Sequence, residues 1–334
     1  MPGPISGALK IYHLPVGQGD ATLIAGPDGT TLLVDAGPNS KAGNQLPGSQ
    51  LNWFVATHND SDHIGGIKWV ALGKDGAPGE KGKDDDGNGL IDWTVGICGE
   101  PAPDPGELNA AGSDDHFPTS GIIYNGDQPT CGSKESKTFQ RFYNIIQAKP
   151  ERVTKLSTFA DLQKAFQQPL NLGSGAKARV VVANGYIFNE PGRVAGVNTQ
   201  NERSIGLYLE YGSFDYLVSG DLTGQKFGAG DEDAKMEEAL GRALLTSADS
   251  PPGDPIDVFK VNHHGSNSAS NASFLLLIKP ETAIISVGKN TYGHPHPEAL
   301  KRLTASGAKI LTTLNGLILI TTDGSAIKVE EKGL

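Results

Sequence analysis

One short segment limits the possible folds more than any other part of the chain. Four side chains that can bind a metal ion fall within six residues, namely His58, Asp60, Asp62 and His63. An apolar run at 51–57 predicts a strand before them, and 65–71 suits a helix after them. A strand, a histidine-rich loop and a helix in this order build a site at the strand's end. The alternative is a solvated acidic loop with incidental histidines. Such a loop does not require His and Asp to alternate over so short a segment. Imidazole and carboxylate together suit zinc, manganese or iron.

The charge balance restricts how the chain can hold a phosphate or a nucleic acid. The sequence has 28 lysines and arginines against 38 aspartates and glutamates, a formal net charge of −10 at pH 7. Nonspecific binding to nucleic acid needs several basic side chains on one surface, and the sequence has no basic cluster. Any phosphate is therefore expected to be held mainly by metal. No apolar run approaches the ~20 residues that span a bilayer, so no membrane contact is expected.

Short strands dominate the expected elements. Strands are predicted at 10–14, 21–25, 31–35, 51–57, 178–183, 204–211, 214–219, 256–261, 282–287, 309–312 and 317–321. Helical spacing of apolar residues is found at 65–71, 137–167, 234–246 and 297–305. Each half of the chain thus has a run of strands and crossover helices. We predict an α/β fold in which two mixed β-sheets pack face to face and are flanked by helices.

The segment 72–135 lacks this periodicity. Gly, Pro, Asp and Asn dominate it, and a structureless loop of such length is uncommon in a compact domain. We therefore predict a single domain over 1–334 with a loop-rich insertion at 72–135. The chain's two cysteines, Cys98 and Cys131, lie in the insertion. They either form one disulfide, as in an oxidising compartment, or remain two buried thiols.

The insertion contains a calcium-type loop at 84–95. Counted from Asp84, oxygen-bearing side chains occupy positions one, three, five and nine, and a glycine occupies position six. This spacing resembles an EF-hand or dockerin loop, although position twelve is Val95, so that Asp114 or Asp115 would have to complete the coordination. A solvated acidic turn is the alternative. The expected calcium ligands are Asp84, Asp86, Asn88, Leu90 and Asp92.

Five motifs occur in an order that resembles the metallo-β-lactamase superfamily. They are Val16-Gly17-Gln18-Gly19-Asp20, Val34-Asp35-Ala36-Gly37, the segment from His58 to His63, Ser219-Gly220-Asp221-Leu222, and Asn262-His263-His264-Gly265-Ser266 with Gly293-His294-Pro295-His296-Pro297. The superfamily's first signature is His-x-His-x-Asp-His, and Asp60 here takes the place of the second histidine. With an aspartate at this position, the chain resembles the soluble metallohydrolase domain of bacterial competence (DNA-uptake) proteins. The resemblance implies the metallo-β-lactamase αββα sandwich.

The resemblance also implies two divalent transition metals, zinc or manganese. Asp221 would bridge both ions, because a carboxylate has two oxygens whereas an imidazole offers one free nitrogen. The other implied ligands are His58 and Asp60 for one ion, and Asp62, His63 and His263 for the second. No histidine lies between His116 and His263, so the superfamily's usual extra histidine is missing. Asn201 or water would have to complete the first site.

The remaining site residues would act around these ions. A water between two such metals loses its proton near neutral pH, and the metals clamp the attacking and leaving oxygens. Asp62 is expected to be essential for turnover, and Asp35 to orient a ligand imidazole rather than bind metal. The candidates to protonate the leaving oxygen or hold a phosphoryl oxygen are His264, His294 and His296. A hydrogen-bonded structural histidine is the alternative for each of the three.

We therefore predict a metal-dependent hydrolase of phosphodiesters, with nucleic acid as the substrate class that the resemblance implies. A phosphorylcholine esterase, a lactonase or a β-lactamase-like enzyme is the alternative, and a metal-stabilised binding module is a third. Hard ions clamp phosphoryl oxygens well, which favours phosphate. No obligate protein partner is evident. The calcium-type loop favours an extracytoplasmic or secreted protein, although the polar first ten residues show no signal peptide. A cytoplasmic protein is the alternative.

Overall fold

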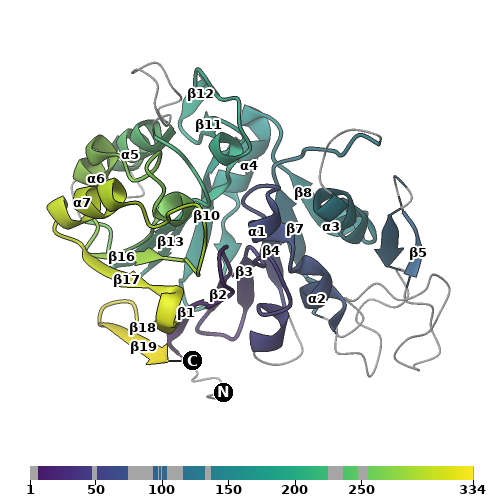
Figure 1. Cartoon of the computed structure of the whole chain (residues 1–334), viewed down its shortest axis with the longest axis horizontal. Helices are drawn as coiled ribbons and strands as arrows, with labels where there is room; N and C mark the ends of the chain where they lie inside the picture. Colours follow the sequence, from purple (N-terminus) through teal and green to yellow (C-terminus); the bar gives the residue numbers. More distant parts are fainter. Residues whose placement is uncertain are drawn as a thin grey trace.

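Two β-sheets form the centre of the molecule, and helices cover their outer faces (Figure 1). The computed structural model describes residues 7–46, 51–73, 93–96, 98, 100–103, 116–131, 137–224, 236–246 and 255–333. The predicted α/β sandwich of two mixed sheets between helices is confirmed.

The first sheet has eight strands in the order β19-β18-β1-β2-β3-β4-β7-β8. In that order they are Ile327–Gly333, Gly316–Thr322, Leu9–His13, Thr22–Ala25, Thr31–Val34, Trp53–Val55, Gly121–Tyr124 and Val153–Lys155. β1 lies between β2 and β18 and pairs with both in antiparallel fashion. The strands from β3 to β8 are parallel, so their carboxyl ends share one edge of the sheet.

The second sheet has nine strands, with β12-β11-β10-β13-β14-β15-β16-β17 in order and β9 paired to β10. In that order they are Glu190–Arg193, Tyr186–Ile187, Lys177–Ala183, Gly206–Tyr211, Phe214–Val218, Val258–Lys260, Thr282–Ile285 and Lys309–Thr312, with β9 at Leu170–Asn171. The strands from β14 to β17 are parallel. A separate two-stranded sheet pairs β5 (Trp93–Val95) with β6 (Pro101–Pro103).

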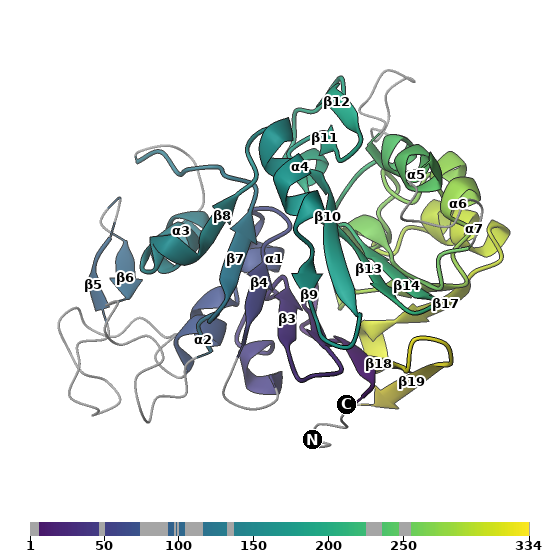
Figure 2. The same ribbon diagram turned by 180° about the vertical axis from the view of Figure 1, so that it is seen from behind.

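The helices lie in two groups, one beside each sheet (Figures 1 and 2). Beside the first sheet are α1 (Ser61–Ile64), α2 (Ile67–Ala71) and α3 (Lys137–Gln147). Beside the second sheet are α5 (Met236–Thr246), α6 (Ala272–Ile278) and α7 (Pro297–Ala305). α4 (Phe159–Gln167) packs against β10. It begins with a capping box between Thr158 and Asp161, which supplies hydrogen bonds to backbone N–H groups at the helix start.

The parallel strands β3 and β4 of the first sheet pack apolar side chains on both faces. Leu32 and Val34 of β3 belong to the core cluster between the two sheets, whereas Leu33 packs with α1 to α3. Phe54 and Val55 of β4 divide in the same way. Successive side chains of a strand point to opposite faces, so a strand covered on both sides reads as a continuous apolar run.

Two of the predicted boundaries are wrong. The predicted insertion at 72–135 includes Gly121–Tyr124, but these residues form β7, which pairs with β4 inside the first sheet. All four are buried, so their sequence shows no alternation that would mark a strand. The predicted helical stretch 137–167 is interrupted by a 3₁₀ turn (Pro150–Arg152) and β8. Pro150 cannot continue a helix, because it lacks the backbone N–H group.

In the predicted insertion, the structure shows the state of the two cysteines but does not describe the predicted calcium ligands. Cys98 and Cys131 form a disulfide, so of the two alternatives the structure has the bridged one. The predicted calcium ligands Asp84, Asp86, Asn88, Leu90 and Asp92 lie outside the described residues. Among the described helices, none combines the length and the apolar character needed to cross a membrane.

Candidate metal centre

The predicted ligands gather where the carboxyl ends of the parallel strands of both sheets meet. In the first sheet, β4 leads to the loop with His58, and α1 carries His63. In the second sheet, β14 leads to Asp221, and β15 leads to His263 and His264. Open α/β sheets bind ligands outside the carboxyl ends of their strands. The fold therefore brings residues more than 150 positions apart in the sequence to one edge.

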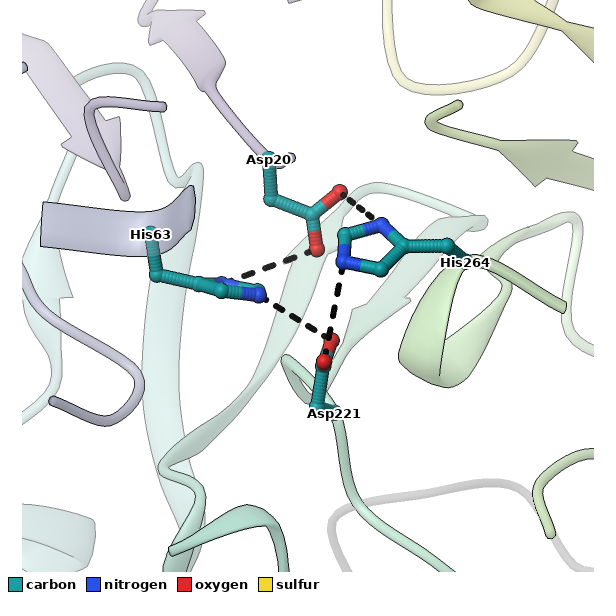
Figure 3. A group of neighbouring side chains, drawn as sticks. All are labelled: Asp20, His63, Asp221 and His264. Atoms are coloured by element: carbon teal, nitrogen blue, oxygen red, sulfur yellow. Dashed lines mark ion pairs between the residues drawn. The ribbon is translucent and has the colours of Figure 1, made fainter. Parts of the chain in front are cut away.

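Four buried side chains form the middle of this group, Asp20, His63, Asp221 and His264 (Figure 3). One nitrogen or oxygen of each lies within 4.8 Å of those of the others. Nε2 of His63 lies 3.2 Å from Oδ1 of Asp221, and Nε2 of His264 lies 3.6 Å from Oδ2 of Asp221. Both imidazoles thus direct Nε2 toward the Asp221 carboxylate.

The orientation of His63 is fixed through its other ring nitrogen. Nδ1 of His63 lies 2.7 Å from Oδ2 of Asp35. The Thr57 backbone N–H and hydroxyl also donate to Asp35, at 2.8 and 2.7 Å. A carboxylate only accepts, so Nδ1 of His63 donates and the unprotonated position of the neutral ring is Nε2. Asp35 contacts the imidazole and lies behind the ligand face.

His264 and His58 are oriented in the same way. Nδ1 of His264 lies 2.9 Å from the backbone carbonyl of Ser286, which can only accept. Its Nε2 then faces Oδ2 of Asp62 at 3.2 Å. Nδ1 of His58 lies 3.1 Å from the Thr57 hydroxyl oxygen, whose hydrogen is directed to Asp35. Nε2 of His58 lies 3.5 Å from Oδ2 of Asp60. Each of these rings thus presents Nε2 for a further ligand.

Four buried atoms at the centre lack hydrogen-bond partners within the described part of the chain. One is Oδ1 of Asp20, and the other three, on predicted ligands, are Nε2 of His58, Nε2 of His63 and Oδ1 of Asp221. Buried polar atoms without partners are rare and need a physical explanation. All three can donate an electron pair, and imidazole nitrogen with carboxylate oxygen is the donor set of divalent transition metals. These residues therefore fit a metal ion.

Asp20 contributes charge from behind the ligand atoms. Lys260, fully buried on β15, forms an ion pair with Oδ2 of Asp20. Asp20 also lies 3.8 Å from Nδ1 of His63 and 3.6 Å from Nδ1 of His264, the nitrogens that already have other partners. We therefore assign Asp20 to balancing Lys260 and both imidazoles rather than to binding metal. Its place in the Val16 to Asp20 motif is the one sequence signal for Asp20, and that motif alone assigns it no role.

The electrostatics of the centre shift its proton affinities strongly. Burial lowers the pKa of His264, but Asp221 and Asp20 outweigh burial and raise that pKa to about 10. Burial likewise opposes a charge on His63, and Asp221 and Asp35 raise its pKa well above the usual range. Burial raises the pKa of Asp221, while His264 and His63 outweigh it and hold that pKa well below its usual range. In the metal-free protein, protons on the two imidazoles thus neutralise the carboxylates.

Three further histidines, the predicted ligand His263 and the predicted catalytic residues His294 and His296, lie at different distances from this centre. His263 has Nε2 3.6 Å from Oδ2 of Asp221, and the ring of His294 lies 5.4 Å from that of His263. Burial and the two neighbouring histidines lower the pKa of His294 to about 4. His296 is the N-cap of α7, where Nδ1 accepts from the Glu298 backbone N–H at 3.2 Å. His263 and His294 therefore line the site, and His296 contacts the start of a helix.

The loop with His263 and His264 has an unusual backbone that other residues hold in place. The two residues have φ of 47° and 51°, in the left-handed region. Such conformations cost free energy outside glycine and cluster at functional sites. Asn262 accepts from the Ser219 hydroxyl and donates to Glu237, both at 2.8 Å. This pair of hydrogen bonds connects the loop to the strand end that leads to Asp221.

Comparison with known proteins shows which sequences this chain resembles. Residues 14–80 match the metallo-beta-lactamase superfamily. The chain is 32% identical over 122 residues to ComE operon protein 3 of Bacillus subtilis, which is 36% of this chain and 14% of that protein. It is 32% identical over 136 residues to competence protein ComA of Neisseria gonorrhoeae, 39% of this chain and 17% of that protein. These matches support a metallo-β-lactamase protein of the competence type.

The chain has an α/β sandwich of two mixed sheets and, among its described residues, a cluster of Asp and His residues that can bind a divalent ion. Its matches span less than a fifth of the curated relatives' length. Among solved structures, it is similar to a mutant of CmlA β-hydroxylase at 10% identity and a TM-score of 0.45, over 96% of this chain and 54% of that one. It is also similar to Tm1679, a metal-dependent hydrolase of the beta-lactamase superfamily, at 12% identity and a TM-score of 0.43, over 98% and 100%.

Proposed function

We propose that this chain is a two-metal phosphodiesterase. The observation that carries the proposal is the convergence of buried, unpartnered ligand atoms of His58, His63 and Asp221 at the edge shared by both sheets. A domain in which metal only stabilised the fold would not need several histidines held with Nε2 toward one shared carboxylate, that of Asp221. Catalytic metal sites, by contrast, keep a position for water or substrate.

The ligand set follows from the contacts. Asp62, His63 and His264 would hold one ion, because Nε2 of His264 lies 3.2 Å from Oδ2 of Asp62. This puts His264 where the sequence suggests His263. Asp221 contacts His63 through Oδ1 and His264 through Oδ2, as expected of a bridging carboxylate.

His263 would complete the other ion's site together with His58 and Asp60. Its Nε2 faces the shared Asp221 carboxylate at 3.6 Å. Burial lowers the pKa of His263, and the nearby His264 and His58 lower it further, so the ring is neutral and can offer Nε2. The superfamily's usual extra histidine is missing, because no histidine lies between His116 and His263. In this arrangement His263 would replace it as a ligand. Asn201, whose amide lies 3.4 Å from that Nε2, borders the same site.

Two bound divalent ions would supply Lewis acidity and a water of lowered pKa. The chain's own groups orient the substrate around them. His294 stays neutral at pH 7, since its pKa is lowered to about 4, so its ring N–H can hold a phosphoryl oxygen. Nδ1 of His294 is buried and has no partner among the described residues, which leaves it available for that contact.

Phosphodiesters fit this centre better than other esters do. Three carboxylates, Asp60, Asp62 and Asp221, lie among the candidate ligands, and carboxylate-rich sets favour hard ions that clamp phosphoryl oxygens. One relative is named a competence protein, and another, 36% identical over 75 residues, is recombination protein 2 of Haemophilus influenzae. These names support nucleic acid as the substrate class.

Replacing one ligand tests the proposal. Asp62→Ala should lower hydrolysis of bis(p-nitrophenyl) phosphate by at least roughly 100-fold while the protein stays folded, because 32% of the Asp62 side chain is exposed and no core is disturbed. Metal content by mass spectrometry and the melting temperature are measured on the same samples. Glu331→Ala, an exposed carboxylate on β19, is the matched control and should change nothing.

Two results would contradict the phosphodiesterase proposal. One is full activity of the Asp62→Ala protein. The other is turnover of a phosphocholine ester, a lactone or nitrocefin by wild-type protein that leaves single- and double-stranded DNA and bis(p-nitrophenyl) phosphate intact. The second result would assign another class of ester to this centre as its substrate.

We also propose an extracytoplasmic or secreted location. The disulfide between Cys98 and Cys131 supports it, because such bonds persist mainly in oxidising compartments. Protein trapped with an alkylating agent in its native host should show no free thiol by mass spectrometry. Two alkylated cysteines would instead place the chain in a reducing compartment.

A further inference from the structure

An exposed aromatic ring borders the candidate metal centre. Tyr292, in the loop between β16 and α7, has 73% of its surface exposed. Its ring lies 5.9 Å from that of His294 at an interplanar angle of 31°. The ring of His294 in turn lies 6.3 Å from that of His264, at 28°. Three rings therefore form a row from a metal-facing histidine to solvent.

The loop holds Tyr292 in place through one side chain, that of Asn290. Oδ1 of Asn290 accepts from the backbone N–H groups of Tyr292 and His294, both at 3.1 Å. Its Nδ2 donates to the carbonyls of Gly288 and His294, at 2.9 and 2.8 Å. A ring on a preorganised loop loses little conformational entropy when a ligand stacks on it.

Exposure alone would not distinguish Tyr292, since single exposed apolar residues are common on protein surfaces. Leu276 on α6 is also 73% exposed, and nothing sets it beside a site. Tyr292 differs because it continues the row of rings that begins at His264. Its exposed face is therefore available to a group attached to whatever occupies the centre.

A nucleobase is the flat group that suits this face. In a nucleotide one sugar separates the base from its phosphate. When the phosphate lies at the centre, we therefore expect its base to lie near the ring of Tyr292, the third ring in the row that begins at His264. Stacking on aromatic side chains is tolerant of sequence and needs an uncovered base face, as in a single strand. The net charge of −10 leaves base stacking, rather than broad phosphate contact, to supply affinity beyond the metals.

We propose that Tyr292 is the stacking platform for the base next to the scissile phosphate, and that the substrate is single-stranded nucleic acid. This inference rests on the phosphodiesterase function proposed above. It makes Tyr292 a specificity-determining residue for that reaction.

Two esters that differ only in the base test the inference. They are thymidine 5′-(p-nitrophenyl phosphate) and 2-deoxyribose 5-(p-nitrophenyl phosphate). Tyr292→Ala should lower kcat/KM for the thymidine ester by roughly 10- to 100-fold, the loss expected for one stacked base, and leave the abasic ester unchanged. Tyr292→Phe keeps the ring and should behave as wild type on both. Leu276→Ala, the matched loss of an exposed apolar side chain, should affect neither.

A binding measurement separates this inference from the proposed function. Fluorescence anisotropy of a short labelled oligothymidylate should show binding that Tyr292→Ala weakens by a similar factor and Tyr292→Phe retains. Tyr292-dependent binding without hydrolysis of either ester would remove the phosphodiesterase proposal and keep the stacking site. Equal loss on both esters, or unchanged oligonucleotide binding by Tyr292→Ala, would overturn the stacking site. So would a Tyr292 effect confined to phosphocholine esters.

Discussion

Each imidazole at the centre of the site is held through Nδ1 by a different partner. His58 uses the Thr57 hydroxyl, His63 uses Asp35, and His264 uses a backbone carbonyl. Because the three Nδ1 positions are engaged, the three Nε2 positions are left for metal ions. The residues behind the imidazoles therefore determine whether a metal can bind.

Asp35→Asn should weaken metal binding by roughly 10- to 100-fold, the usual effect of losing such a support. The Asn amide would face Nδ1 of His63 with a donor, which favours the tautomer that protonates Nε2. Metal affinity measured by competition with a fluorescent chelator checks this. Asp28→Asn is the control, because Asp28 accepts from the Thr30 N–H in an exposed turn away from the centre. Equal affinity of the Asp35→Asn and wild-type proteins would show that Asp35 does not set the tautomer.

Metal binding should also release protons and weaken as the pH falls. In the metal-free protein the pKa of His264 is raised to about 10 and that of His63 is raised well above its usual range, so both are protonated at pH 7. A divalent ion must displace those protons, on the order of one or two per protein. Isothermal titration calorimetry at pH 7 in buffers of different ionisation enthalpy measures this number. Heats that do not depend on the buffer would contradict the prediction.

The sequence predicted the grouping of the candidate ligands better than it predicted their contacts. His58, Asp60, Asp62 and His63 stand close together in the chain, so their grouping needs no tertiary information. The choice between His263 and His264 depends on two left-handed backbone conformations and on a carbonyl of a distant strand end. The role of Asp20 depends on Lys260, 240 residues away in the sequence. Neither relation leaves a local pattern.

At the scale of elements, α5 is joined to the site by a buried carboxylate. Glu237 accepts from the Asn262 amide at 2.8 Å and from the backbone N–H groups of Ser270 and Asn271 at 2.7 and 2.8 Å. Burial raises the pKa of Glu237 to about 7, against the opposing effect of these hydrogen bonds. One side chain thus connects a helix, the histidine loop and the segment before α6.

This raised pKa makes the stability of the fold depend on pH with a definite sign. Between the ordinary value of 4.5 and about 7, the folded protein holds a proton on Glu237 that the unfolded chain has lost. The free energy of unfolding of wild type should therefore fall as pH rises through this window, relative to that of Glu237→Gln, by about 3 kcal/mol. Urea denaturation of both proteins at several pH values measures the difference. A difference that is constant with pH would mean that Glu237 ionises normally.

The elements that sequence patterns predicted are those with regular alternation, helical spacing or an apolar run bounded by turn residues. β7 is four buried residues without alternation, and β8 lies between two helices whose apolar residues continue one another's spacing. β19, with the sequence IKVEEKG, is an edge strand with few apolar residues, and its identity depends on pairing with β18. For such short strands the partner, rather than the local sequence, decides the structure.

At the scale of the whole molecule, the acidic surface should govern how salt affects substrate binding. A net charge of −10 gives no broad positive face. Between about 50 and about 200 mM salt, the dissociation constant for a single-stranded oligonucleotide should rise less than about fourfold, the value for about one phosphate contact. Anisotropy titrations across this range measure the change. A loss near 1000-fold would instead reveal a basic binding surface.

The pairing of β1 with β18 links the order of synthesis to the order of folding. The ribosome releases Leu9–His13 long before one of its two neighbours, Gly316–Thr322. Until then one side of β1 is an open edge, able to pair with the wrong strand. Pairings so distant in sequence also form slowly. The sheet that positions His58 and His63 can thus close only after β18 has emerged, and a nascent chain would acquire metal at these residues only from that point on.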